Sequence, residues 1–133
     1  MKVTFADSAY YMALLNARDQ HHERAKKASA GLQGQILTTT WVLTELADAF
    51  CKPSQREIVA AFVADLLADS RVIVIPPTLD LFNRGLTFYL RRADKDWSLT
   101  DCISFVVMED RGVTEALATD RDFEQAGFVA LLS

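Results

Sequence analysis

The stretch VTFADSAYYMALL, residues 3–15, is the most informative part of the sequence, because an apolar run passes directly into a helix-like segment at a single carboxylate. Residues 2–6 predict a short buried strand, since polar and apolar side chains alternate weakly along them. A helix is expected from about Ser8 to Asn16, with Ser8 as its N-cap. Asp7 lies at the junction, where an ionised carboxylate beside the core is costly unless it is paired or binds a cation.

Short strand-like runs recur along the chain and alternate with helix-like segments. Further strands are expected at residues 35–39, 71–75, 115–118 and 128–132. Further helices are expected at residues 19–32, 40–50, 55–68, 78–92 and 98–111. This alternation implies right-handed crossovers and a parallel sheet covered by helices on both faces. The sequence therefore predicts one α/β domain, residues 1–133, with a core large enough to fold alone.

Two of these helices carry clear signals. In the first, Leu43, Leu46 and Phe50 lie on one helix face, and Thr40 is the expected N-cap. In the second, Ser98 begins a helix whose interior is nearly all apolar, so burial on several sides is expected.

Composition and charge exclude several classes of protein. No apolar stretch approaches the roughly 18 residues of a membrane-spanning helix. The N-terminal apolar run is too short for a signal peptide, so a cytosolic protein is expected. The net charge of −4 argues against a general nucleic-acid coat, which would be basic. Four carboxylates in a metal site would account for that acidic excess, and bound cations would locally reverse its sign.

The cysteine and histidine residues do not suggest a zinc site. Cys51 and Cys102 have no CxxC partner, and in a reducing cytosol we expect them to be small core residues. His21 and His22 are remote from both cysteines, show no ligand spacing and are expected on a solvated helix face.

Four acidic residues at the edges of apolar runs carry the functional hypothesis. In parallel sheets, sites form beyond the carboxyl ends of the strands. Asp7 follows the first expected strand, and Asp120 follows the strand at 115–118. Glu45 and Asp101 lie in or near the first turns of two helices. We therefore expect these four carboxylates to converge on one crevice.

Each carboxylate also has an ordinary structural interpretation, which the sequence leaves open. Ser98-Leu99-Thr100-Asp101 fits a capping box, in which the acid accepts a bond from the N-cap amide. Asp7 could cap the first helix, Glu45 could be a surface residue, and Asp120 could belong to a turn. Asp122 could share a metal or cap the short turn that follows. Each interpretation is sufficient for its own residue. Together they do not explain why four carboxylates all lie at the edges of apolar runs.

Carboxylates at one sheet edge suit the chemistry of magnesium. Mg²⁺ is a hard cation that takes oxygen ligands and keeps several waters. Two such ions, about 3.5–4 Å apart, can align the attacking water and the leaving oxygen of a phosphodiester. The hydroxyls of Ser8 and Thr119 could position a water or a carboxylate. The chain has no Ser-His-Asp set, Cys-His set, P-loop or GxGxxG that would point to another chemistry.

Four segments together resemble the PIN-domain ribonucleases, especially the VapC-type toxins of bacterial toxin–antitoxin pairs. They span nearly the whole chain and read VTFADSAYYMALL (3–15), LTTTWVLTELADAF (37–50), WSLTDCISFVVMEDRGV (97–113) and ALATDRDFEQAGF (116–128). The resemblance implies a three-layer α/β/α sandwich with a central, mainly parallel sheet. It also implies RNA cleavage with Mg²⁺ or Mn²⁺ in the cytoplasm, homodimer formation, and inhibition by a cognate antitoxin protein.

The resemblance also assigns residues. It places the catalytic, metal-binding quartet on Asp7, Glu45, Asp101 and Asp120, and the family's small hydroxyl positions on Ser8 and Thr119. Asp122 is expected to have a secondary role. Basic residues near the rim could hold flanking phosphates or simply form a solvated face: Arg91, Arg92, Lys95 and Arg121.

Two alternative functions follow from the same residues. The first is a catalytically silent PIN-like module that binds protein partners; the complete acidic quartet argues against it. The second is a phosphatase on a similar sheet. An aspartyl-nucleophile phosphatase would need a D-x-D motif after the first strand, and the sequence there is Asp7-Ser8-Ala9.

Overall fold

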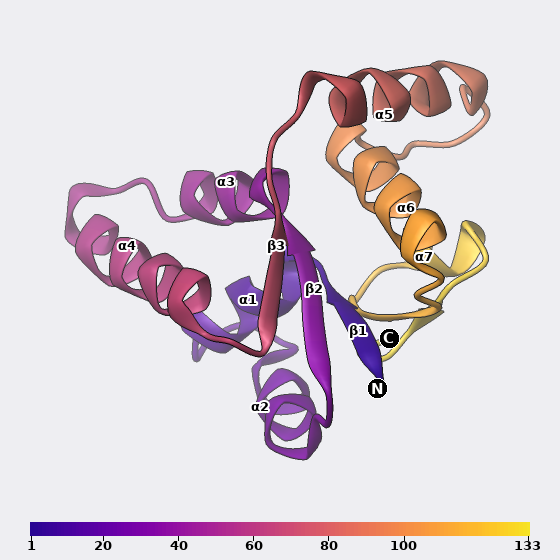
Figure 1. Ribbon diagram of the computed structural model, residues 1–133. Helices are drawn as coiled ribbons and strands as arrows, with labels where there is room; N and C mark the ends of the chain where they lie inside the picture. Colours follow the sequence, from indigo (N-terminus) through magenta and orange to yellow (C-terminus); the bar gives the residue numbers. More distant parts are fainter.

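Five short parallel strands form the centre of the protein, as the alternation of segments predicts (Figure 1). The computed structural model describes residues 1–133. The strands are β1 (Val3–Ala6), β2 (Gln35–Thr39), β3 (Val72–Ile75), β4 (Glu115–Leu117) and β5 (Val129–Ala130). Their order in the sheet is β3-β2-β1-β4-β5, with every neighbouring pair parallel.

Seven helices connect the strands and cover the sheet. They are α1 (Ser8–Leu15), α2 (His22–Gly31), α3 (Thr40–Ala49), α4 (Pro53–Ala68), α5 (Leu79–Arg91), α6 (Leu99–Arg111) and α7 (Arg121–Gln125). α1 packs on α2 and α3, α3 packs on α4, and α5 packs on α6. None of the helices is long and apolar enough to cross a membrane.

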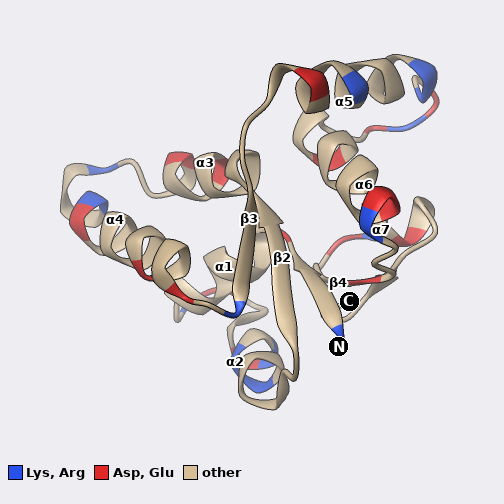
Figure 2. Ribbon diagram, viewed as in Figure 1, with Lys and Arg blue, Asp and Glu red and all other residues tan.

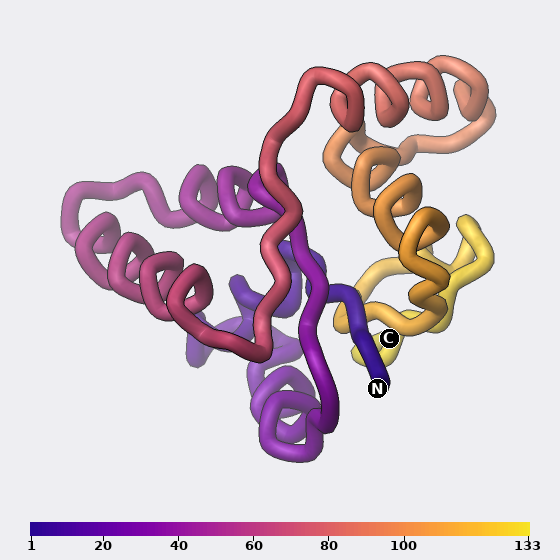
Figure 3. The backbone as a smooth tube through the Cα atoms, in the orientation of Figure 1, coloured from indigo at the N-terminus to yellow at the C-terminus, as the bar shows by residue number.

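The direction in which the chain winds reverses between β3 and β4. The chain first moves outward from β1 to β2 and β3, and then returns past β1 to β4 and β5. Figure 3 traces this return from β3 to α5, and Figure 1 shows α3 and α4 on the opposite side of the strands from α5, α6 and α7. Because right-handed crossovers in opposite directions cover opposite faces, the α/β/α layering follows from the strand order. β1 and β4 lie side by side at the reversal, where open α/β sheets place their ligand sites.

The core is formed by the inward side chains of the sheet and of the helices on both faces. Phe5, Leu37, Ile103 and Met108 are almost completely buried. Gly85 allows α5 to approach α6 closely, since a Cβ atom there would collide with Ile103. The nearly apolar helix that follows Ser98 is buried on several sides, as expected.

The structure corrects several local expectations about helix ends. Ser8 is not the N-cap of α1, because Asp7 occupies that position. Thr40 is not the N-cap of α3: the hydroxyl of Thr39 accepts a bond from the amide of Val42 (3.2 Å), whereas Thr40 donates to the carbonyl of Ile75 (2.9 Å).

Other corrections concern strand length and burial. The last strand is shorter than expected because the chain turns after it, with the amide of Ser133 donating to the carbonyl of Ala130 (3.4 Å). Cys102 is a core residue as predicted, but Cys51 is exposed at the end of α3. His22 is half-buried rather than solvated, since a ring nitrogen lies 2.7 Å from the carbonyl oxygen of Ala13.

Candidate active site

The four predicted acidic residues gather around the carboxyl ends of β1 and β4. Asp7 directly follows β1, and its amide donates to the carbonyl of Leu117 at the end of β4 (3.1 Å). Asp120 begins α7 just beyond β4, and Asp101 lies in the first turn of α6. Glu45 is on α3, which begins where β2 ends. The negative charges of the other three all act on Asp7, so the four residues lie at the same edge of the sheet.

Asp7 is the most buried member, and one of its two carboxylate oxygens has no hydrogen-bond partner, although the backbone amide of Ser8 lowers its pKa. Its exposed fraction is 4%, and its Oδ1 atom makes no hydrogen bond. Although the residue occupies the N-cap position of α1, its side chain forms no capping bond. Burial raises the pKa of Asp7 well above its usual range, and the charge of Asp101 is the next largest contribution. Helix capping therefore does not account for this carboxylate.

Asp101 acts as a helix cap and also contributes to the acidic crevice. The hydroxyl of Ser98 accepts a bond from the amide of Asp101 (3.0 Å), and the amide of Ser98 donates to Oδ2 of Asp101 (3.2 Å). Burial raises the pKa of Asp101 from 3.8 to about 6; the bonds to Ser98 oppose this rise, and the charges of Asp120 and Asp122 add to it. The predicted capping box is present, and it holds a carboxylate whose pKa is raised to about 6.

Asp120 and Asp122 are more exposed than Asp7 and Asp101. Oδ1 of Asp120 accepts a bond from the amide of Asp122 (3.2 Å), which caps α7. Asp120 is exposed as a whole residue, but partial shielding of its carboxyl group from water raises its pKa, as does the neighbouring charge of Asp122. The charge of Asp122 thus acts on both Asp101 and Asp120.

Glu45 is held at the crevice by a hydroxyl group. The Oγ atom of Ser8 donates a hydrogen bond to Oε1 of Glu45, which joins α1 to α3. Thr38, just before α3, is fully buried, and its hydroxyl donates to the carbonyl of Ala6 (2.9 Å). These bonds fix the start of α3 against the end of β1. Thr119 is half-buried next to Asp120, and no hydrogen bond joins its hydroxyl to the carboxylates.

The carboxylates have the chemistry of a divalent-cation site but do not form a closed set of ligands. No three acidic, histidine or cysteine side chains are close enough together to enclose an ion on their own. The fit to a cation rests on the unpartnered Oδ1 of Asp7 and on the carboxylate charges that raise its pKa. Mg²⁺ retains several waters and uses few carboxylates, so an incomplete protein shell is compatible with it. A cation bound there would favour the ionised carboxylates.

Some of the basic residues predicted near the rim form ion pairs and others do not. The Nε atom of Arg92 lies 3.0 Å from a carboxylate oxygen of Asp94, and the guanidinium of Arg92 lies over the Trp97 ring, 4.8 Å from its centroid. Arg121 lies between two acidic members of the cluster, is exposed, and forms no ion pair. Figure 2 shows basic residues at the end of α5 and in the loop after it.

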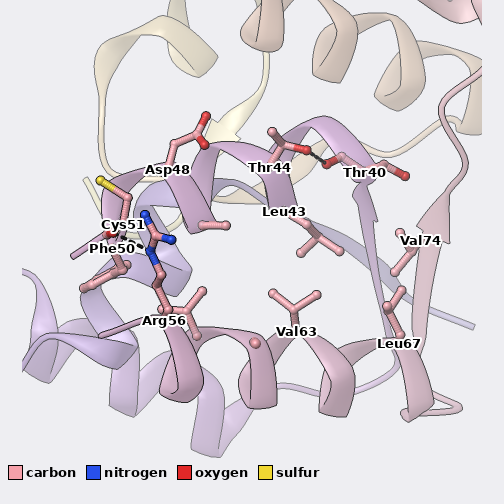
Figure 4. A pocket seen from close by; sticks show the side chains of 13 residues that line it. Thr40, Leu43, Thr44, Asp48, Phe50, Cys51, Arg56, Val63, Leu67 and Val74 are labelled. Atoms are coloured by element: carbon pink, nitrogen blue, oxygen red, sulfur yellow. Dashed lines mark hydrogen bonds between the residues drawn. The ribbon is translucent and has the colours of Figure 1, made fainter. Parts of the chain in front are cut away.

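A large hollow lies away from the four acidic residues, between α3 and α4. This groove, of about 690 Å³, has mainly apolar walls, and Leu43 and Val63 face one another across it (Figure 4). Leu67 and Val74 close one end, and Arg56 lies at the other. The sequence did not reveal this groove, because its width depends on the distance between two helices.

The chain is similar to known proteins over nearly its whole length. The family model described as PIN domain matches residues 5–129, a range that contains the four acidic residues. The 23S rRNA-specific endonuclease VapC20 of Mycobacterium tuberculosis, found in two strains, is 34% identical over 128 residues, which are 94% of this chain and 95% of that protein. A crystal structure of M. tuberculosis VapC20, described as a sarcin–ricin loop cleaving toxin, matches with a TM-score of 0.87 and 30% identity. That match covers 96% of this chain and 97% of the VapC20 chain.

Proposed function

Because the chain belongs to the PIN-domain family and is a VapC-type endoribonuclease toxin, we propose that it cleaves 23S ribosomal RNA with the help of Mg²⁺ or Mn²⁺. The observation that carries the metal assignment is the buried, unpartnered Oδ1 atom of Asp7 beside three further carboxylates. Asp7, Asp101 and Asp120 would hold the cation, and Glu45 would either join them or orient the attacking water.

The reaction is the hydrolysis of a phosphodiester. The chemistry that a divalent cation supplies when bound is positive charge, which offsets the charge of the phosphate and favours ionisation of water. Oε1 of Glu45 already accepts the Ser8 hydroxyl, so Oε2 is the atom free to take a proton from the attacking water. The oxygen of that water forms a bond to phosphorus, the bond from phosphorus to the ribose oxygen breaks, and that oxygen acquires a proton. Ser8 is thus a positioning residue for Glu45.

The RNA target is proposed from the relatives and from the charge of the site. The relative that matches over nearly its full length, found in two strains, is named for 23S rRNA, and the crystal structure of VapC20 is described as a toxin that cleaves the sarcin–ricin loop. Loops suit a protein of net charge −4, since they can be recognised by stacking and by base edges as well as by phosphates. The proposal places the activity in the cytoplasm, where ribosomes are found.

Two protein partners complete the proposal. A cognate antitoxin would inhibit the toxin, and the groove between α3 and α4 has the apolar walls that an amphipathic segment requires. A second copy of the chain would form a homodimer, for which exposed apolar residues such as Leu79 and Leu90 on α5 are available.

The test is cleavage of ribosomes and of purified ribosomal RNA in the presence of Mg²⁺, followed by sequencing of the new RNA ends. Asp7→Asn should reduce the cleavage rate by at least about 100-fold, the size of effect expected when an essential metal ligand is lost. Asp65→Asn is the matched control, because Asp65 is exposed on α4 and makes no ion pair. A folded Asp7→Asn protein that cuts at the wild-type rate would exclude the site, and new ends outside 23S rRNA would exclude the target.

A further inference from the structure

A second hollow, distinct from the acidic crevice, lies between α5 and α6. Its volume is about 380 Å³, which is at the lower end of the range for small-ligand pockets. Phe88, Phe105 and Phe128 contribute aromatic surface to its walls. Its rim carries four charged residues: Arg84, Arg92, Glu109 and Asp110.

The aromatic walls are held in a fixed arrangement. The ring centroids of Phe105 and Phe128 are 5.7 Å apart, and Trp97 packs edge-on against Phe105 at 5.1 Å. On its other side Trp97 stacks with Phe88 at 5.8 Å. Trp97 is buried, and its indole N–H donates to Gln125 (3.2 Å). A packed aromatic group of this kind offers a ready-made surface for a planar ligand.

The charged side chains on the rim are held in place by their neighbours, but they can still form further hydrogen bonds. Arg84 forms two short bonds to Asp110, of 2.6 and 2.7 Å, and the guanidinium has further N–H donors beyond these two. Arg92 is held by Asp94 and by the Trp97 ring. Glu109 is exposed and forms no ion pair.

Two guanidinium groups and two carboxylates make this rim close to neutral. A phosphate entering the hollow would meet the carboxylates of Glu109 and Asp110, so a phosphate is a poor occupant. A neutral planar group that both donates and accepts hydrogen bonds suits this rim better.

The hollow lies along the same helix face as one member of the acidic cluster. Asp101, Phe105 and Glu109 are spaced at i, i+4 and i+8 on α6. With a rise of 1.5 Å per residue, Phe105 is about 6 Å and Glu109 about 12 Å from Asp101 along the axis. An RNA strand whose phosphate lies at the acidic crevice would therefore carry a neighbouring base to the hollow.

We propose that the hollow between α5 and α6 binds one unstacked base of the RNA substrate, and that this base is guanine. Guanine presents two acceptors, O6 and N7, on one edge and an amino donor on another. The acceptors suit the guanidinium groups of Arg84 and Arg92, and the donor suits the carboxylate of Glu109. The inference rests on the proposed function, because the RNA strand is what brings a base to this position.

Binding of single nucleotides tests the proposal without any need for catalysis. The chain has two tryptophans, and only Trp97 touches the walls of the hollow, whereas Trp41 is on α3. Titration of ¹⁵N-labelled protein with guanosine monophosphate should shift the indole resonance of Trp97 in a saturable way and leave that of Trp41 in place. Adenosine, cytidine and uridine monophosphates should bind about tenfold more weakly. Inosine monophosphate, which lacks the amino donor, should fall between them and guanosine monophosphate.

A pair of variants tests whether the carboxylate of Glu109 recognises the base. Glu109→Gln should weaken binding of guanosine monophosphate about tenfold. Glu57→Gln, the same change at an exposed position on α4, should have no effect. The proposal is overturned if Trp97 does not respond, if all four nucleotides bind alike, or if Glu109→Gln binds like the wild type. Loss of RNA cleavage in Asp7→Asn bears on the nuclease site alone, so the two failures are distinguishable.

Discussion

The acidic crevice and the apolar groove between α3 and α4 are both left incomplete by the folded chain, but in opposite chemical ways. Glu45 and Leu43 are two residues apart, and thus about 200° apart around the axis of α3. Glu45 contributes to the crevice, and Leu43 lines the groove. In the crevice, the carboxylates repel one another and Oδ1 of Asp7 makes no hydrogen bond. In the groove, apolar surface remains open to water.

The difference shows what each surface would gain from a ligand. A cation in the crevice would remove electrostatic repulsion, so its effect should depend on pH and on the number of carboxylates. A partner segment in the groove would remove apolar surface from water, an effect that scales with buried area and depends little on charge.

The stability of the metal-free protein should reveal the strain in the crevice through its dependence on pH. The pKa of Asp101 is about 6 in the folded protein instead of 3.8, so the folded state binds more protons than the unfolded state between these values. This group therefore stabilises the fold below about pH 4, and the contribution is lost as pH rises to about 6. The loss should be about 2–3 kcal/mol.

Urea unfolding in the presence of a chelator, from pH 4 to pH 8, measures this loss. Asp69, Asp94 and Asp110 have lowered pKa values, each because of a neighbouring arginine, and they act in the opposite direction. The comparison that isolates the crevice is therefore wild type against Asp101→Asn. Identical pH profiles for the two proteins would show that Asp101 is not strained.

Ser8→Ala tests whether the crevice needs a fixed Glu45. Loss of the bond from Ser8 to Glu45 should lower kcat for RNA about tenfold, the usual effect of losing one hydrogen bond to a charged group. KM should change little, because Ser8 is not placed to touch the RNA backbone. Ser54→Ala on α4 is the control. An unchanged kcat in a folded Ser8→Ala protein would show that Glu45 does not depend on this contact.

A change in the groove should have little effect on stability or on RNA cleavage, in contrast to a change in the crevice. Leu67 lines the groove and has an exposed fraction of 62%, so it contributes little to the core. Leu67→Ser should change the free energy of unfolding by less than about 0.5 kcal/mol and leave RNA cleavage unaltered. It should weaken binding of the antitoxin, measured by calorimetry. A large loss of stability would mean that Leu67 belongs to the core and not to a binding surface.

The sequence was a good guide wherever one residue type and its local spacing determine the structure. The alternation of segments predicted the parallel sheet, and the Ser98–Asp101 spacing predicted the capping box that is present. The positions of Asp7 and Asp120 after their strands predicted that both would lie at one sheet edge. The family match supports the resemblance seen in the four segments, and it favours a ribonuclease over a silent module or a phosphatase.

Sequence reasoning was weakest where the outcome depends on the packing of distant elements. The N-cap of α3 is Thr39 because Thr40 finds a better partner in the carbonyl of Ile75, on another strand. The prediction that Asp7 could cap a helix was right about its position and wrong about the bond, because its carboxylate is buried among other acids. The groove and the exposure of Cys51 follow from how far apart α3 and α4 lie, which no local pattern encodes.

If Asp7 and its neighbours form an electrostatically strained site for a divalent cation, filling that site should stabilise the protein. Thermal unfolding of wild type and Asp7→Asn at pH 8, each in chelator and in excess Mn²⁺, measures this effect. We predict that in chelator Asp7→Asn is more stable than wild type, because a buried charge is removed. We also predict that Mn²⁺ stabilises wild type and has little effect on Asp7→Asn. Lower stability of Asp7→Asn in chelator, together with equal stabilisation of both proteins by Mn²⁺, would contradict the claim.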